Sequence, residues 1–229
     1  MTWGWLEGRA ADVPAGDAWL AEAEKGLLGP AAVPARRSDW RLGRWTAKRA
    51  LAGYLGLPAT TATWPALAIL PDAAGAPLAT YRSQPLRVSL SISHRAERAL
   101  AVVGAAGVEV GCDLERIEAR SPAFVADFLT GAERQLWAAH AGAERDAVAN
   151  RIWSAKESVL KLARRGLRVD PREVEIRFGT DGPRCGWRAF TADWAPVGDC
   201  AGWWRSEEDL IYTMVSRPSL PPPRPLSPK

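Results

Sequence analysis

The chain has 229 residues, enough for one large domain or two of modest size without support from disulfides or metals. Its composition is 47% hydrophobic and 24% charged, and no apolar run approaches the roughly 20 residues that a membrane span needs, so we expect no membrane partner. The N-terminus lacks a signal-peptide pattern, which favours the cytoplasm.

A net charge of +4 without an arginine-rich run or a nucleic-acid motif argues against nucleic acid as a partner, and it suits an anionic ligand or an acidic protein. The three cysteines have neither disulfide-framework nor zinc-site spacing.

In chain order, the first predicted element is a helix that ends at Leu55, with Ser38 or Asp39 as its N-cap and Gly56 as its stop. Residues 65–85 are interrupted by prolines and are predicted to be mostly loop, with room for one short strand. Apolar and polar residues then alternate, which predicts strands over 87–94, 99–103 and 108–114. We expect these three strands to form an antiparallel meander.

Helical signals follow in the second half of the chain. Ser121 before Pro122 has the pattern of a helix N-terminus, and Thr130 and Glu133 have the spacing of a capping box. A longer helix is predicted over residues 146–165, followed by strands over 174–178, 187–190 and 210–215. Because helices and strands alternate without the rhythm of a parallel sheet, the predicted class is α+β.

A crude doubling divides the chain near residue 110, because each half offers helical material and a set of strands, although no repeat of individual residues supports a duplication. We therefore predict an N-terminal half over residues 1–110 and a C-terminal half over 111–216. Residues 217–229 are rich in proline and are predicted to form a disordered, polyproline-like tail.

Three acidic residues are candidates for binding a metal ion. Asp113 and Glu115 lie two apart on a predicted strand, so their carboxylates share a face that suits a hard cation such as Mg²⁺. Glu157 and Lys161 lie four apart on a predicted helix and would add a third carboxylate beside a cation for a phosphate. The alternatives are a polar strand face for the first pair and, for the second, a surface ion pair of roughly 0.3–0.5 kcal/mol.

Basic residues upstream are candidates for binding an anion. His94 follows a strand edge and could contact a phosphate or act as an acid or base; the alternative is a histidine in the core or one that caps a turn. Arg37, Arg41, Arg44 and Lys48 recur at a helical period. This stripe is either an anion-binding face or a solvated helix face.

Four segments together resemble the surfactin-type 4′-phosphopantetheinyl transferases in order and spacing. They are Gly43-Arg44-Trp45-Thr46-Ala47-Lys48-Arg49-Ala50-Leu51, Ile92-Ser93-His94-Arg95, Gly111-Cys112-Asp113-Leu114-Glu115 and Trp153-Ser154-Ala155-Lys156-Glu157-Ser158-Val159-Leu160-Lys161. The last is the most specific. This chain departs from the family pattern at Ala76, where a lysine is common, at Arg95 and at Cys112.

The resemblance implies two similar α+β halves packed as a pseudo-dimer in a monomeric enzyme. The implied enzyme moves the phosphopantetheine group of coenzyme A onto a serine of an acyl, peptidyl or aryl carrier protein. It implies Mg²⁺, with Mn²⁺ as an alternative, bound by Asp113, Glu115 and Glu157, and catalytic roles for Glu157, Lys161 and His94. Coenzyme A would contact residues of both halves, namely Arg37, Arg41, Arg44, Lys48, Ser93, His94, Lys156 and Lys161.

Two other functions are compatible with the same residues. One is a Mg²⁺-dependent hydrolase of a coenzyme A or nucleotide pyrophosphate, which would need water but no protein acceptor. The other is a carrier-binding module that has the fold without the activity.

Overall fold

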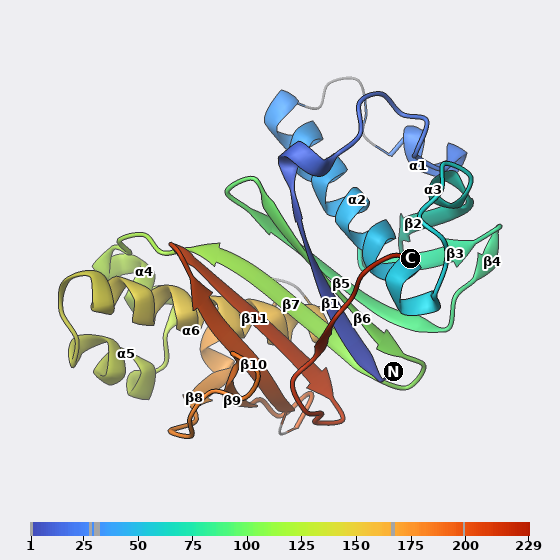
Figure 1. The fold of residues 1–229 in the computed structure, drawn as a ribbon. Coiled ribbons are helices and arrows are strands. Elements are labelled where there is room, and N and C mark those ends of the chain that lie inside the picture. Colours follow the sequence, from blue (N-terminus) through green and yellow to red (C-terminus); the bar gives the residue numbers. More distant parts are fainter. Residues whose placement is uncertain (1, 28, 30–32, 166–167, 199) are drawn as a thin grey trace. The chain divides into compact units, whose positions relative to one another are not determined.

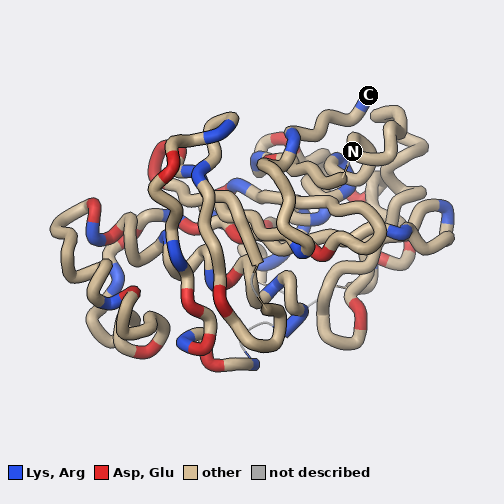
Figure 2. Tube along the Cα trace, turned by 90° about the horizontal axis from the view of Figure 1, so that it is seen from below, with Lys and Arg blue, Asp and Glu red and all other residues tan. Residues whose placement is uncertain are grey.

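The computed structural model describes residues 2–27, 29, 33–165, 168–198 and 200–229, and the chain divides into two compact units. The first unit comprises Met1–Val108 and Pro223–Lys229, and the second comprises Glu109–Pro222 (Figure 1). Helices and three sheets are both present, so the predicted α+β class is confirmed. Among the described helices, none combines the length and the apolar character needed to cross a bilayer. Basic and acidic residues are interspersed along the trace (Figure 2), in keeping with the small net charge.

The first unit contains a long helix packed on an antiparallel sheet. The sheet has the order β12-β1-β6-β5, in which only the pairing of β12 with β1 is parallel, and helix α2 packs against β1, β5 and β6. A smaller sheet has the order β2-β3-β4. The bounds are β1 Trp3–Arg9, η1 Ala10–Asp12, α1 Glu22–Lys25, α2 Pro34–Leu55, α3 Thr63–Ala66, β2 Leu67–Pro71, β3 Pro77–Tyr81, β4 Gln84–Pro85, β5 Val88–Arg95, β6 Arg98–Ala105 and β12 Arg224–Pro225.

The second unit repeats this design with a single sheet of order β7-β11-β10-β9-β8, which is antiparallel throughout. Its long helix α6 packs on β7 and β11 (Figure 1). The bounds are β7 Glu109–Arg116, α4 Pro122–Phe128, α5 Gly131–Ala138, α6 Gly142–Leu162, η3 Pro171–Glu173, β8 Glu175–Phe178, β9 Arg188–Asp193, β10 Cys200–Glu207 and β11 Leu210–Arg217.

Several local predictions are confirmed at helix ends. The Ser121 side chain accepts a hydrogen bond from the Phe124 backbone at the start of α4, and Thr130 and Glu133 form the capping box of α5. Helix α2 ends at Leu55, and Gly56 adopts a left-handed conformation with φ of 69°. Its start was predicted wrongly, because Pro34 rather than a residue after Ser38 begins the helix.

Two predictions about strands are wrong. Residues 65–85 form β2, β3 and β4 rather than mostly loop, because the prolines stand at the ends of these strands. The meander ends after its second strand, because β7 pairs with β11 instead of β6. The sequence also did not indicate β1 and β10.

The C-terminal tail is ordered where disorder was predicted over residues 217–229. Strand β12 runs parallel to β1, the Leu226 backbone donates to the Trp5 carbonyl at 2.7 Å, and the Ala59 backbone donates to the Lys229 carbonyl at 2.6 Å. Leu226 is buried in the core beneath α2. The reason is that an extended proline-containing segment fits an edge strand, where missing N–H donors are tolerated.

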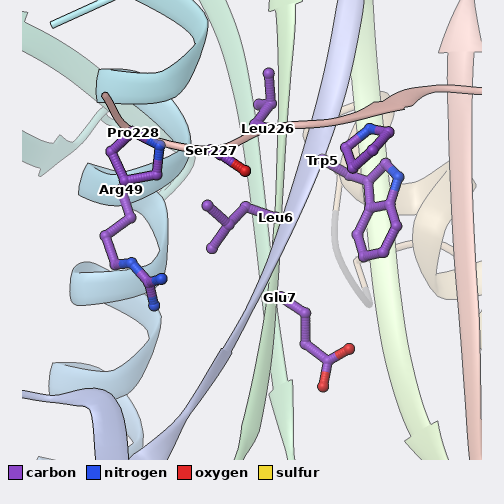
Figure 3. A pocket seen from close by; sticks show the side chains of 8 residues that line it. Trp5, Leu6, Glu7, Arg49, Leu226, Ser227 and Pro228 are labelled. Atoms are coloured by element: carbon purple, nitrogen blue, oxygen red, sulfur yellow. The ribbon is translucent and has the colours of Figure 1, made fainter.

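Gly53 of α2 makes room for this tail. A Cβ at residue 53 would lie 2.9 Å from the backbone carbonyl carbon of Ser227, so a larger residue would displace the segment. An open hollow of about 480 Å³ remains beside the tail, between Leu6 of β1 and Arg49 of α2 (Figure 3). Residues 223–229 are therefore a structural part of the first unit.

The two units share one order of elements. When η1, η3, β12 and the short elements α3, β4 and α4 are set aside, each unit has a strand, a short helix, a long helix and four further strands. In the first unit these are β1, α1, α2, β2, β3, β5 and β6, and in the second they are β7, α5, α6, β8, β9, β10 and β11. The long helices also carry a matching segment that sequence reasoning missed, Trp45-Thr46-Ala47-Lys48 in α2 and Trp153-Ser154-Ala155-Lys156 in α6.

The lysine of each matching segment forms the same buried ion pair. Lys48 Nζ lies 2.6 Å from Glu24 Oε2, and Lys156 Nζ lies 2.8 Å from Glu133 Oε2. Each glutamate is the third residue of its short helix, and its other oxygen accepts from a strand backbone, Ile69 or Ile176. The two units therefore repeat one internal ion-pair arrangement with corresponding residues.

Candidate functional site

The site is built where strand β7 lies against helix α6 in the second unit. Gly111 allows this approach, because a Cβ there would be 1.9 Å from the Ser158 carbonyl oxygen and 2.7 Å from the Leu162 nitrogen. Two residues further along β7, the Asp113 side chain is covered and only 4% of the residue is exposed. The face that carries Asp113 and Glu115 therefore meets α6 instead of bulk water.

One face of α6 contacts both acidic residues of the strand. Trp153 Nε1 donates to Glu115 Oε1 at 3.1 Å, and Lys161 Nζ donates to Asp113 Oδ1 at 2.6 Å. Glu157 lies midway between Trp153 and Lys161 at intervals of four residues, so it is on the same helix face. The register of helix and strand thus sets Glu157 over the Asp113 and Glu115 pair.

The electrostatics of Glu157 agree with this placement. Burial raises its pKa to about 7, and the neighbouring Asp113 and Glu115 carboxylates raise it too, while Lys161 lowers it. Its Oε1 atom is buried and accepts no hydrogen bond. Burial opposes the charge of Lys161 as well, but Asp113, Cys112 and Glu157 raise the net pKa of that ammonium.

These residues have the chemistry of a divalent-cation site. The Asp113 and Glu115 carboxylates are close enough to Glu157 to raise its pKa, and a buried carboxylate oxygen that accepts no hydrogen bond is the kind of atom that a hard cation satisfies. Across the described part of the chain, no three acidic, histidine or cysteine side chains form a ready coordination group. Two of the carboxylates are instead bound by cationic side chains, Asp113 by Lys161 and Glu115 by Arg120, with Arg120 Nη2 3.2 Å from Glu115 Oε2.

Other predicted residues lie in the first unit. Ser93 is buried and His94 is exposed near the end of β5, where His94 Nδ1 lies 3.9 Å from Asp39 Oδ2. Arg44 is largely buried, with its Nε 3.8 Å from Glu24 Oε1, and burial lowers the pKa of its guanidinium. Asp113, Glu115, Glu157 and Lys161 come together in the second unit, whereas Ser93, His94 and Arg44 belong to the first.

Three residues that were predicted to contact coenzyme A have partners inside the protein. Lys48 donates to Glu24, Trp19 and Trp64, so all three of its N–H groups are used in the core. Arg41 instead holds a neighbouring loop, donating to Asp17 and to the Pro14 carbonyl. Arg37, by contrast, remains exposed near the start of α2.

The third of these residues is Lys156. It is fully buried, and its ammonium is bound by Glu133 and by the carbonyls of Pro171 and Val174. All three N–H groups of the ammonium are therefore used inside the protein.

Sequence reasoning missed Arg120, which donates to the Glu115 oxygen that Trp153 does not bind, and Asn150, which accepts from Arg120. Neither residue belongs to the quoted motifs, and their pairing depends on how α6 packs beside the segment after β7. Trp153 was part of a motif, but only the structure assigns it a partner.

Comparison with known proteins supplies a family for the second unit. No curated protein matches the chain. Residues 109–198, which begin with β7 and include Asp113, Glu115, Glu157 and Lys161, match a family model. That model is the 4′-phosphopantetheinyl transferase superfamily, so this segment carries a domain of that superfamily.

Proposed function

We propose that this protein transfers the 4′-phosphopantetheine group of coenzyme A to a serine of an apo carrier protein and releases 3′,5′-ADP. The observation that carries the proposal is the α6 face of Trp153, Glu157 and Lys161 set over Asp113 and Glu115. This arrangement lies inside the segment that matches the transferase superfamily. The motifs favour the surfactin-type subfamily.

Asp113, Glu115 and Glu157 would hold Mg²⁺, or Mn²⁺ as an alternative. A bound divalent ion would neutralise charge on the phosphate oxygens and polarise the phosphorus that the serine attacks. Glu157 favours such a cation, because its half-buried carboxylate has a raised pKa and an oxygen that accepts no hydrogen bond. Cation binding would therefore offset the cost of ionising Glu157 in its buried setting.

Two side chains of α6 would act in the transfer itself. Lys161 carries a positive charge beside Asp113 and would stabilise the charge of the transferring phosphoryl group. Glu157 would accept the proton of the serine hydroxyl as a general base. Holding the serine beside both groups reduces the entropic cost of the reaction.

The first unit would supply further contacts to coenzyme A. We assign Ser93, His94 and Arg44 to its adenosine and phosphate groups, in the two-half pseudo-dimer arrangement that the resemblance implies. The shared order of elements and the repeated pairs Lys48 with Glu24 and Lys156 with Glu133 support an internal duplication. With alanine at residue 76, a basic residue such as Arg44 would replace the usual lysine.

The test is intact-mass analysis of apo acyl, peptidyl and aryl carrier proteins after incubation with the protein, coenzyme A and Mg²⁺. We expect at least one carrier to gain the mass of a phosphopantetheine group. Asp113→Asn should abolish the gain, while the matched variant Asp209→Asn, on an exposed ion pair with Arg116, should retain it. Unmodified carriers with continued breakdown of coenzyme A would instead favour a hydrolase, and no turnover at all would favour a carrier-binding module.

A further inference from the structure

Arg120 links the candidate site to the buried part of α6. Its Nη2 donates to Glu115 Oε2 at 3.2 Å and its Nε donates to Asn150 Oδ1 at 2.7 Å. Nη1 forms an ion pair with Glu118 Oε1 at 3.1 Å, and the guanidinium lies 4.7 Å from the centre of the Phe124 ring. Only 15% of the Arg120 side chain is exposed, so these contacts hold it in one orientation.

Asn150 in turn fixes Arg120. It is fully buried on α6, and its Nδ2 donates to the carbonyls of Glu118 and Asp146 at 2.7 and 2.8 Å. Because both amide hydrogens are used, the Oδ1 atom must face the other way, toward the Arg120 guanidinium. The amide therefore presents a single acceptor to Arg120.

The two oxygens of Glu115 are thus held by different donors. Trp153 Nε1 binds Oε1, and Arg120 binds Oε2. Each carboxylate oxygen has a second lone pair, so both can still coordinate a cation while they accept these hydrogen bonds. Partners of this kind orient a metal ligand, and their loss typically costs 10- to 100-fold in metal affinity or activity.

We infer that Arg120 and Asn150 are positioning residues that set the Glu115 carboxylate for divalent-cation binding. This inference rests on the proposed function of the same site. It differs from a simple charge effect, because a positive guanidinium near the ion would by charge alone weaken cation binding. Positioning therefore predicts weaker cation binding when lysine replaces Arg120, whereas charge alone predicts no change.

The experiment measures Mn²⁺ binding to the full-length protein by electron paramagnetic resonance, without coenzyme A or carrier. Asn150→Leu changes no charge and should raise the Mn²⁺ dissociation constant about tenfold. Arg120→Lys retains the charge but cannot bridge Asn150 and Glu115, and should weaken binding in the same direction. Arg116→Gln, which alters an exposed ion pair on the same strand, is the control and should bind as the wild type does.

A second readout separates positioning from folding. If Glu115 is merely misplaced, raising the Mn²⁺ concentration should restore transfer by Arg120→Lys to near the wild-type rate, and thermal melts should show a folded protein. Unchanged affinity in both variants, or tighter binding in Arg120→Lys, would overturn the inference. If the wild-type protein binds no Mn²⁺, the cation site of the proposed function fails and this inference fails with it. Wild-type binding with indifferent variants would refute the inference alone.

Discussion

The buried pair of Lys156 and Glu133 gives the sharpest prediction about stability. Lys156→Met removes an ammonium that makes three hydrogen bonds and leaves the Glu133 carboxylate with only the backbone donors of Thr130 and Ile176. Breaking one side of a buried ion pair costs about 3–5 kcal/mol, so we expect a loss of that size in the free energy of unfolding. Urea denaturation followed by tryptophan fluorescence measures it.

The double variant isolates the pair. Glu133→Gln alone should also destabilise, but the combination with Lys156→Met should cost less than the sum of the single changes, by about 1–3 kcal/mol of coupling. Lys25→Met, on an exposed pair with Glu22, is the matched control and should change stability by less than about 1 kcal/mol. A Lys156→Met protein of wild-type stability that has lost affinity for coenzyme A would refute the structural role and restore the ligand contact.

Three further predictions follow from Glu157 and the tail. The pKa of Glu157 is about 7 in the folded protein and 4.5 ordinarily, so folding favours the protonated carboxyl group. The stability that this preference contributes is fully present below pH 4.5 and is lost as the pH rises through 7. Glu157→Gln should therefore stabilise the metal-free protein at pH 8 by roughly 1–3 kcal/mol in urea melts, while abolishing transfer; equal stability at pH 8 would contradict this. Leu226→Ala should cost about 2–4 kcal/mol, whereas the exposed control Leu78→Ala should cost less than about 0.5 kcal/mol, and equal losses would argue against a packed tail. Gly53→Val should expel the tail, with faster proteolysis after residue 222 as the readout; an unchanged cleavage pattern would mean that the tail does not need that space.

The sequence predicted best what depends on neighbouring residues. Ser121 and Thr130 were identified as caps because a short side chain reaches a backbone donor three residues away. The candidate cation site also depends on short spacings in the sequence. Asp113 and Glu115, two apart on a strand, share a face of that strand, and Glu157 and Lys161, four apart on a helix, share a face of that helix. That Asp113, Glu115 and Glu157 bind a cation stays a prediction, and the contacts of these carboxylates with Lys161 and Arg120 were not predicted.

What depends on distant partners was missed. Strand β7 looked like the third strand of a meander, but its partner β11 lies about a hundred residues further on, with Asp113 opposite Thr213. Likewise, a helical period placed Lys48 in a basic stripe, although Glu24, remote in sequence, takes it into the core. The tail was misjudged because proline content excludes a central strand but permits an edge strand beside β1.

Product stoichiometry tests the proposed transfer most directly. Wild-type protein, coenzyme A, Mg²⁺ and a limiting apo carrier would be sampled over time for 3′,5′-ADP and for modified carrier. The proposed mechanism predicts equal amounts of the two products and an end to ADP release when the carrier is exhausted. Continued release of ADP after that point, or release without any carrier, would contradict it.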